Sequence, residues 1–141
     1  MMSHKQLVED LVTQTGQTPA VLGLDYGHDK IFTLEELQEA NQVLIDHWNQ
    51  GGLITVNWVP QNPWVDDATE PENNSGNWLP VTRTPIVDGG EAVGIVLNDL
   101  VDPATEVHQA WRNQLDIVAA ALQELQEAGV TVLWRPIQEM N

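Results

Sequence analysis

Three side chains that can bind a ligand or transfer a proton follow an apolar run near the end of the sequence. Arg135, Gln138 and Glu139 come directly after residues 130–134, which are apolar except for one threonine. Such a run predicts a buried parallel strand, and Pro136 should end its pairing because proline has no N–H to donate. The carboxyl ends of parallel strands are where α/β folds carry their chemistry. An acid in that place is a candidate for acid–base catalysis.

Each of these residues also has a purely structural interpretation. Gln138 and Glu139 could belong to a solvated loop, and Arg135 could pair with a buried carboxylate. His47 and His108 lie on predicted helices, too far apart in sequence to indicate a metal site. The sequence also lacks the glycine-rich fingerprints of nucleotide-binding folds. We therefore expect neither a metal nor a cofactor.

Helices and strands alternate along the chain. The patterns predict helices between residues 3 and 16, 33 and 51, and 102 and 129, strands at residues 20–24, 53–56 and 130–134, and a long loop from residue 59 to about residue 94. Thr33 with Glu36 matches a capping box, Asp102 is expected to cap the last helix, and Gly129 to end it. The last helix should bury one apolar stripe, made of Trp111, Leu115, Val118, Leu122 and Leu125. This order favours a parallel sheet with right-handed crossovers, an α/β fold.

The composition limits the classes of partner. The chain of 141 residues is about the length of one domain and carries 21 acidic against 5 basic residues, a formal net charge of −16. Such a surface repels phosphate groups, so we expect neither nucleic acid nor a membrane as partner, whereas a neutral sugar is indifferent to the charge. No stretch is long and apolar enough for a membrane span or for the core of a signal peptide.

The end of the chain resembles a known signature. The run Val-Leu-Trp-Arg-Pro-Ile-Gln-Glu-Met-Asn at residues 132–141 is similar to the acid/base signature of glycoside hydrolase family 26, the β-mannanases and related enzymes. Residues 18–26 and 51–63 resemble the second and third strands of that family, and residues 115–130 resemble the helix that leads to its fourth strand. The resemblance implies a (β/α)8 TIM barrel of about 250 residues or more. Residues 1–141 would be a partial barrel, truncated at both ends, that supplies strands two to four of a single catalytic domain.

By this resemblance, Glu139 is the general acid/base of a retaining endo-β-1,4-mannanase-like glycosidase. Such an enzyme protonates the leaving sugar oxygen and needs a second carboxylate about 5–5.5 Å away as nucleophile. No residue of the chain matches that nucleophile, so we expect the chain to be inactive alone. Gln138 stands where the family usually has histidine, and its amide can still donate a hydrogen bond. The implied partner is a β-linked polysaccharide or oligosaccharide, with mannan as the first choice.

Three tryptophans are candidates for sugar-binding or supporting roles. Trp78 lies where family members often place an aromatic sugar platform, Trp64 could stack on sugar or anchor the loop, and Trp58 could be core or site wall.

Other functions remain open beside the mannanase interpretation. Val59 replaces a histidine that many members carry, which leaves a β-glucanase or xylanase of the same family open. A non-catalytic carbohydrate-binding remnant and a standalone α/β domain without a sugar role are the further alternatives. The family resemblance implies secretion, and the sequence does not specify an oligomeric state.

Overall fold

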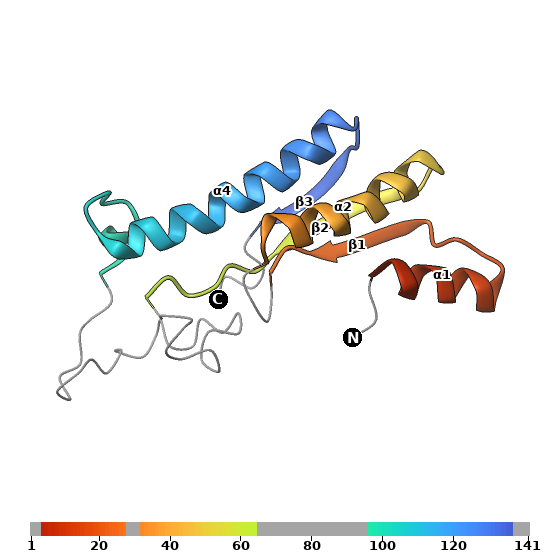
Figure 1. Ribbon diagram of the computed structural model, residues 1–141, viewed down its shortest axis with the longest axis horizontal. Coiled ribbons are helices and arrows are strands. Elements are labelled where there is room, and N and C mark those ends of the chain that lie inside the picture. The colour runs from red at the N-terminus through yellow and green to blue at the C-terminus, as the bar shows by residue number, and fades with distance from the viewer. Residues whose placement is uncertain (1–3, 28–31, 65–95, 137–141) are drawn as a thin grey trace.

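The computed structural model describes residues 4–27, 32–64 and 96–136. The helices and strands follow the predicted order, with one short 3₁₀ helix in addition (Figure 1). They are α1 (His4–Thr15), β1 (Val21–Asp25), α2 (Leu34–Asn49), β2 (Leu53–Trp58), the 3₁₀ helix η1 (Leu97–Leu100), α4 (Glu106–Glu127) and β3 (Val132–Pro136). Most of the predicted long loop lies outside the described residues. No helix in the described ranges is long and apolar enough to cross a membrane.

The strands form one parallel sheet in the order β1-β2-β3, which confirms the predicted parallel sheet. Val21 pairs with Leu53 at one end of β1, and Asp25 pairs with Asn57 at the other. Asn57 pairs in turn with Arg135 of β3. The three strands therefore end at the same edge of the sheet, and the polar residues that end each apolar run meet there.

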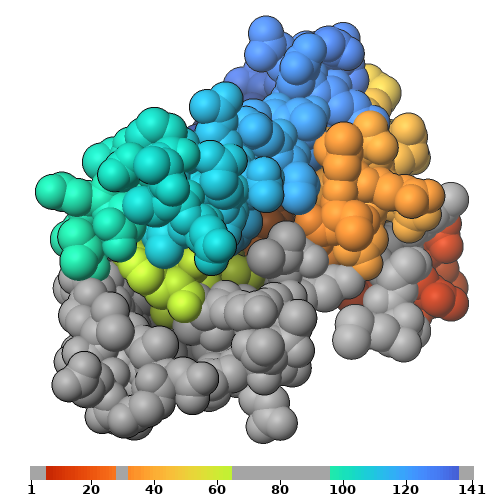
Figure 2. Space-filling model, turned by 60° about the vertical axis from the view of Figure 1, so that its left-hand side comes forward, coloured from red at the N-terminus to blue at the C-terminus, as the bar shows by residue number. Residues whose placement is uncertain are grey.

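Helices α2 and α4 pack side by side on one face of the sheet, and Figure 2 shows them next to each other on the surface (Figures 1 and 2). Along β2, Ile54, Val56 and Trp58 are buried against these helices because the side chains of a strand alternate between its two faces. The complete buried apolar core comprises Leu24, Tyr26, Leu37, Leu44, Ile54, Val56, Trp58, Val118, Ala121, Leu125 and Val130.

The opposite face of the sheet, which we call the open face, is not covered by any described helix. Its large apolar side chains are strongly exposed: Val21 by 48%, Leu53 by 51% and Leu133 by 58%. The other residues of the open face, placed by the strand register, are Gly23, Asp25, Thr55, Asn57 and Arg135. In a closed barrel this face would line the interior.

The predicted signals at both ends of α2 are confirmed. The Thr33 side chain accepts from the backbone N–H of Glu36 at 3.2 Å, and the Glu36 carboxylate accepts from the N–H of Thr33 at 3.0 Å. After the helix, Gly51 has φ +88°, a left-handed conformation that glycine adopts without strain. Gly129 has φ +74° after α4, as predicted.

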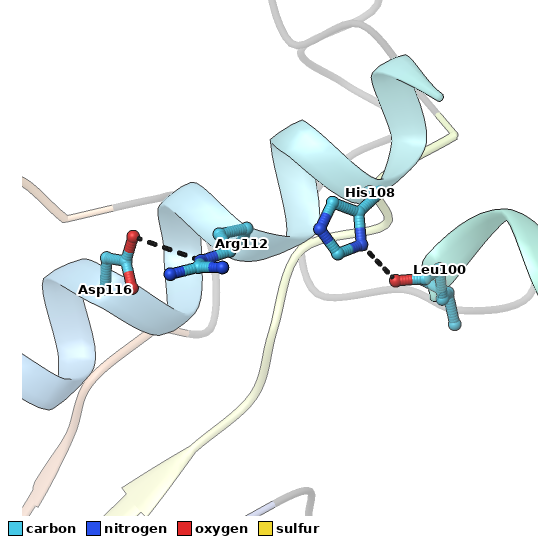
Figure 3. A network of polar contacts seen from close by, with 4 residues as sticks. All are labelled: Leu100, His108, Arg112 and Asp116. Atoms are coloured by element: carbon cyan, nitrogen blue, oxygen red, sulfur yellow. Dashed lines mark hydrogen bonds and ion pairs between the residues drawn. The ribbon is translucent and has the colours of Figure 1, made fainter. Parts of the chain in front are cut away.

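The predicted start of the last helix is wrong. Thr105, not Asp102, is the N-cap of α4, and its Oγ1 accepts from the N–H of His108 at 3.1 Å. Asp102 instead accepts from the N–H of Ala104 at 3.0 Å and closes the turn that precedes the helix. The Nδ1–H of His108 donates to the carbonyl of Leu100 at 2.8 Å, which ties η1 to the first turn of α4 (Figure 3). Thr105 is also a residue type that caps helices well, and its hydroxyl donates to the carbonyl of Asp99 in η1 at 2.6 Å.

Gly52 lies directly against the ring of His47. A Cβ on Gly52 would come within 2.0 Å of Nε2 and 2.3 Å of Cδ2 of His47, whose side chain is only 4% exposed. The ring would have to leave its place in the core. We expect Gly52→Ala to lower the free energy of unfolding by about 1–3 kcal/mol, the usual cost of overpacking. Urea unfolding followed by tryptophan fluorescence measures this loss.

His47→Ala is the matched control for that substitution. It removes the ring that the added methyl group meets, so Gly52→Ala should cost clearly less in the His47→Ala background. Equal costs in both backgrounds would show that the contact with His47 does not decide the effect.

Candidate functional site

The predicted site lies where β3 ends. β3 runs from Val132 to Pro136, where the described residues end, and Pro136 pairs with Trp58 of β2. The structure describes three of the predicted site residues, Arg135, Trp58 and Trp64. The other three, Glu139, Gln138 and Trp78, lie outside the described residues, and their roles stay predictions.

Polar side chains from all three strands form a hydrogen-bonded row at the carboxyl edge of the sheet. Nδ2 of Asn57 donates to Oδ1 of Asp25 at 2.7 Å, and Nε of Arg135 donates to Oδ1 of Asn57 at 2.7 Å. The two partners together decide the orientation of the Asn57 amide, which donates at one end and accepts at the other. We call Asp25, Asn57 and Arg135 the strand-end row. It connects one negative and one positive charge through a neutral amide.

Sequence reasoning missed Asp25 and Asn57 as members of the site. A usable signal was present, because each follows the apolar residues of its strand, as Arg135 does. What the sequence does not contain is the register that brings the three to the same level of the sheet.

A hollow of about 610 Å³ opens beside the strand-end row. Its lining consists of Thr55, Asn57, Val132, Leu133, Trp134 and Arg135. The hollow therefore combines N–H and O–H groups with apolar side chains. Four of the lining residues, Thr55, Asn57, Leu133 and Arg135, belong to the open face, so in a closed barrel other interior side chains would pack into much of this space.

Trp58 lies on the helix-covered face and not on the open face. Its side chain is 4% exposed, and its ring stacks on Trp111 of α4 with the ring centroids 5.4 Å apart and the planes inclined by 28°. Of the two interpretations of Trp58, the structure confirms a core position. A supporting role stays a prediction: by packing on Trp111, Trp58 holds the carboxyl end of β2 against α4.

The segment after β2 is held against α4 by a pair of glutamines. Gln114 is buried on α4, accepts from the backbone N–H of Gln61 at 2.9 Å and donates to its carbonyl at 3.3 Å. Farther on, Oδ1 of Asn62 accepts from the N–H of Trp64 at 3.0 Å. Trp64 is half-buried, and its buried Nε1 has no hydrogen-bond partner among the described residues. The sugar-stacking role of Trp64 stays a prediction.

The likeness to known proteins extends over the whole chain. The family model described as "Glycosyl hydrolase family 26" matches residues 2–141. The "Mannan endo-1,4-beta-mannosidase A and B" of Caldalkalibacillus mannanilyticus is 32% identical over 140 residues, which are 97% of this chain and 23% of that protein. The "Mannan endo-1,4-beta-mannosidase" of Bacillus subtilis is 32% identical over 135 residues, which are 93% of this chain and 32% of that protein. The chain thus spans 23% and 32% of the length of these two relatives.

Solved structures with the same arrangement of strands and helices agree with this likeness. GH26A from Muricauda sp. has a TM-score of 0.66 at 27% identity, over 97% of this chain and 40% of that one. The Bacillus subtilis mannanase man26 has a TM-score of 0.64 at 27% identity, over 98% of this chain and 39% of that one. These likenesses confirm the expected fold, in which the three-stranded parallel sheet and its helices are part of a (β/α)8 barrel.

Proposed function

Because the chain belongs to glycosyl hydrolase family 26, we propose that it forms part of a glycosidase that hydrolyses β-1,4-mannan. The observation that carries this proposal is the likeness, over 97% of the chain, to a relative named as a mannan endo-1,4-beta-mannosidase. Residues 1–141 contribute part of one (β/α)8 catalytic domain in this proposal. Its expected partner is a β-linked polysaccharide.

Glu139 is the general acid/base of the proposed reaction. It follows shortly after Pro136, where β3 ends at the carboxyl edge of the sheet. A glycosidic oxygen leaves easily only when it receives a proton as the bond breaks, and the resulting carboxylate can then activate water for the second step of a retaining mechanism. The nucleophile of that mechanism comes from outside residues 1–141, since no residue of this chain matches it.

The other candidates are assigned supporting roles around Glu139. The amide of Gln138 donates to a sugar hydroxyl or to Glu139, and the ring of Trp78 stacks on a sugar face. Trp64 is a second stacking candidate in the same long loop. Arg135 lines the hollow near the end of β3, and its proposed role is to support the site around Glu139.

A related substrate is the second candidate, because Val59 directly follows β2 and cannot donate a side-chain hydrogen bond. Its backbone N–H is taken by the carbonyl of Gly27 at 3.2 Å. A site that lacks the hydrogen bond of a histidine at this place discriminates less strictly between sugars. A β-1,3/1,4-glucan or a xylan therefore remains the alternative substrate of the same chemistry.

A hybrid protein tests the proposal. Residues 2–141 of this chain replace the matching segment of the Bacillus subtilis mannan endo-1,4-beta-mannosidase, which supplies the rest of the barrel; we call this protein the hybrid barrel. We expect it to release reducing ends from β-mannan faster than from mixed-linkage glucan or xylan. The unaltered Bacillus protein is the control for the assay.

The other outcomes are equally informative. A hybrid barrel that unfolds cooperatively and prefers glucan or xylan would favour the second candidate. One that binds mannan oligosaccharides in calorimetry without any hydrolysis, and loses this binding in Trp78→Ala, would contradict the catalytic proposal and favour a carbohydrate-binding role.

A further inference from the structure

The strand-end row joins opposite charges on strands that do not pair with each other. β1 and β3 both pair with β2, so the backbones of Asp25 and Arg135 are separated by two strand spacings, about 9–10 Å. Asn57 lies between them in register and hydrogen-bonds each at 2.7 Å. An amide suits this place because it donates from Nδ2 and accepts at Oδ1. The carboxylate is thereby linked to the guanidinium through one side chain.

The link should contribute to stability because the strand-end row lies on the open face of the sheet. In a closed barrel the open face lines the interior, where an ionised side chain is stable only when it is paired and hydrogen-bonded. One level below the row, the same face carries Thr55 and Leu133, and below them the apolar Val21 and Leu53. The row is thus the level at which the sheet changes from apolar to charged.

We propose that Asp25 and Asn57 are positioning residues: through the amide of Asn57, the carboxylate of Asp25 holds the guanidinium of Arg135 where the chain leaves β3 toward Glu139. This inference rests on the proposed function for the role of Glu139. The bond from Nε sets the plane of the guanidinium, because the guanidinium is rigid and Nε is part of it. The negative charge of Asp25 offsets the positive charge of Arg135 and so favours the protonated form that a general acid needs.

The link can be tested by exchanging the carboxylate of Asp25 and the amide of Asn57 and measuring the thermal stability of each variant. Asn57→Asp alone places two carboxylates in contact, and Asp25→Asn alone removes the negative charge that the Asn57 amide links to Arg135. We expect each to lower the melting temperature of the hybrid barrel, in which the open face is covered, by about 1–4 °C. Asp25→Asn combined with Asn57→Asp restores both hydrogen bonds, since an amide at position 25 now donates to a carboxylate at position 57, which still accepts from Arg135.

The combined variant should therefore recover at least half of the summed loss. Thermal unfolding followed by circular dichroism measures the melting temperatures of all the variants, so this test needs no assay of activity. Additive losses in the combined variant would overturn the link.

Kinetics of the hybrid barrel test the positioning role. Asn57→Ala removes the hydrogen bond to Nε of Arg135, so kcat on mannan should fall about tenfold while KM changes less than about twofold. Asp25→Asn removes a negative charge, so the acid loses its proton at lower pH. The basic limb of kcat/KM should then move down by about 0.3–1 pH unit.

Thr55→Val is the matched control for both measurements. The Thr55 hydroxyl donates to the carbonyl of Leu133 at 3.1 Å, so its loss also removes a hydrogen bond between β2 and β3 on the same face. It should lower the melting temperature but leave the basic limb in place. An unchanged basic limb in Asp25→Asn, or an equal shift in Thr55→Val, would overturn the positioning role. A hybrid barrel that folds but hydrolyses nothing overturns the proposed function, and the stability cycle still decides the link.

Discussion

Replacing Glu139 with glutamine in the hybrid barrel is expected to lower kcat on β-mannan by about 10²–10⁴-fold, the usual contribution of a general acid. Glutamine has nearly the same shape as glutamate but has no acidic proton to give to the leaving sugar oxygen. The binding of mannan should change little, so KM should stay within a few-fold of its starting value. Initial rates of reducing-end release across a range of mannan concentrations measure both quantities.

A substrate with an easier leaving group separates loss of the acid from general damage to the site. An aryl mannooligosaccharide with an acidic phenol as leaving group needs no protonation in the first step, so Glu139→Gln should lower kcat/KM for phenol release much less than it lowers kcat/KM for mannan. The second step loses its base on both substrates, so kcat should fall on both. Gln138→Ala is the neighbouring control, because it removes a hydrogen-bond donor but leaves the acid in place. An equal loss of kcat/KM on both substrates, or an unchanged rate on mannan, would contradict the assignment of Glu139.

The order of helices and strands could be predicted because local signals decide it. The capping box of Thr33 with Glu36 and the left-handed Gly51 after α2 need only neighbouring residues. The apolar runs of β2 and β3 similarly predict buried parallel strands without any knowledge of their partners. These features were confirmed with shifts of one or two residues at the strand ends.

The packing of α4 was harder to predict because the sequence does not show which side of an apolar stripe faces the sheet. Leu115 was expected to lie in the stripe, yet it is 38% exposed, whereas the polar Gln114 beside it is buried. The partner of Gln114 is the backbone of Gln61, which is 53 residues away in the sequence. Helical periodicity does not contain a contact of that range. The sequence showed only that the polar Gln114 lies next to Leu115 of the expected stripe, and this does not indicate which of the two is buried.

Only one member of the strand-end row could be predicted, because the links within the row are not local. Arg135 could be placed at the carboxyl edge because the strand before it and Pro136 after it are adjacent in the sequence. Its link to Asn57 spans 78 residues, and the link from Asn57 to Asp25 spans 32. Both depend on strand order and register. These are set by the packing of the whole sheet and not by any local pattern.

Asn41 is a buried polar side chain with three hydrogen-bond partners, and its replacement with aspartate should damage the fold strongly. It is fully buried on α2, and its Nδ2 donates to the carbonyl of Ala121 at 2.8 Å and to Oε2 of Glu124 at 2.7 Å. Its Oδ1 accepts from the hydroxyl of Tyr26. Burial raises the pKa of Tyr26 well above its usual value, so the phenol keeps its proton and remains the donor. The amide thus joins the end of β1, α2 and α4.

Asn41→Asp turns the donating end of this side chain into an acceptor that faces two other acceptors. We expect the free energy of unfolding at pH 7 to fall by about 3–5 kcal/mol, as for a buried charge without a partner, measured by urea unfolding. Burial among acceptors should raise the pKa of the new carboxyl above its unfolded value. The penalty relative to the unsubstituted chain is then full above that folded pKa, and it shrinks as the pH falls toward about 4.

Gln38→Glu adds the same charge to an exposed position of α2 and should change the free energy of unfolding by less than about 0.5 kcal/mol. This control separates burial of the charge from its mere addition to an acidic protein. Protonation at low pH would return a donor to position 41, because a carboxylic acid can donate to the Ala121 carbonyl where a carboxylate cannot. A penalty in Asn41→Asp that is the same at pH 4 and pH 7 would therefore mean that lost packing, and not the charge, carries the effect.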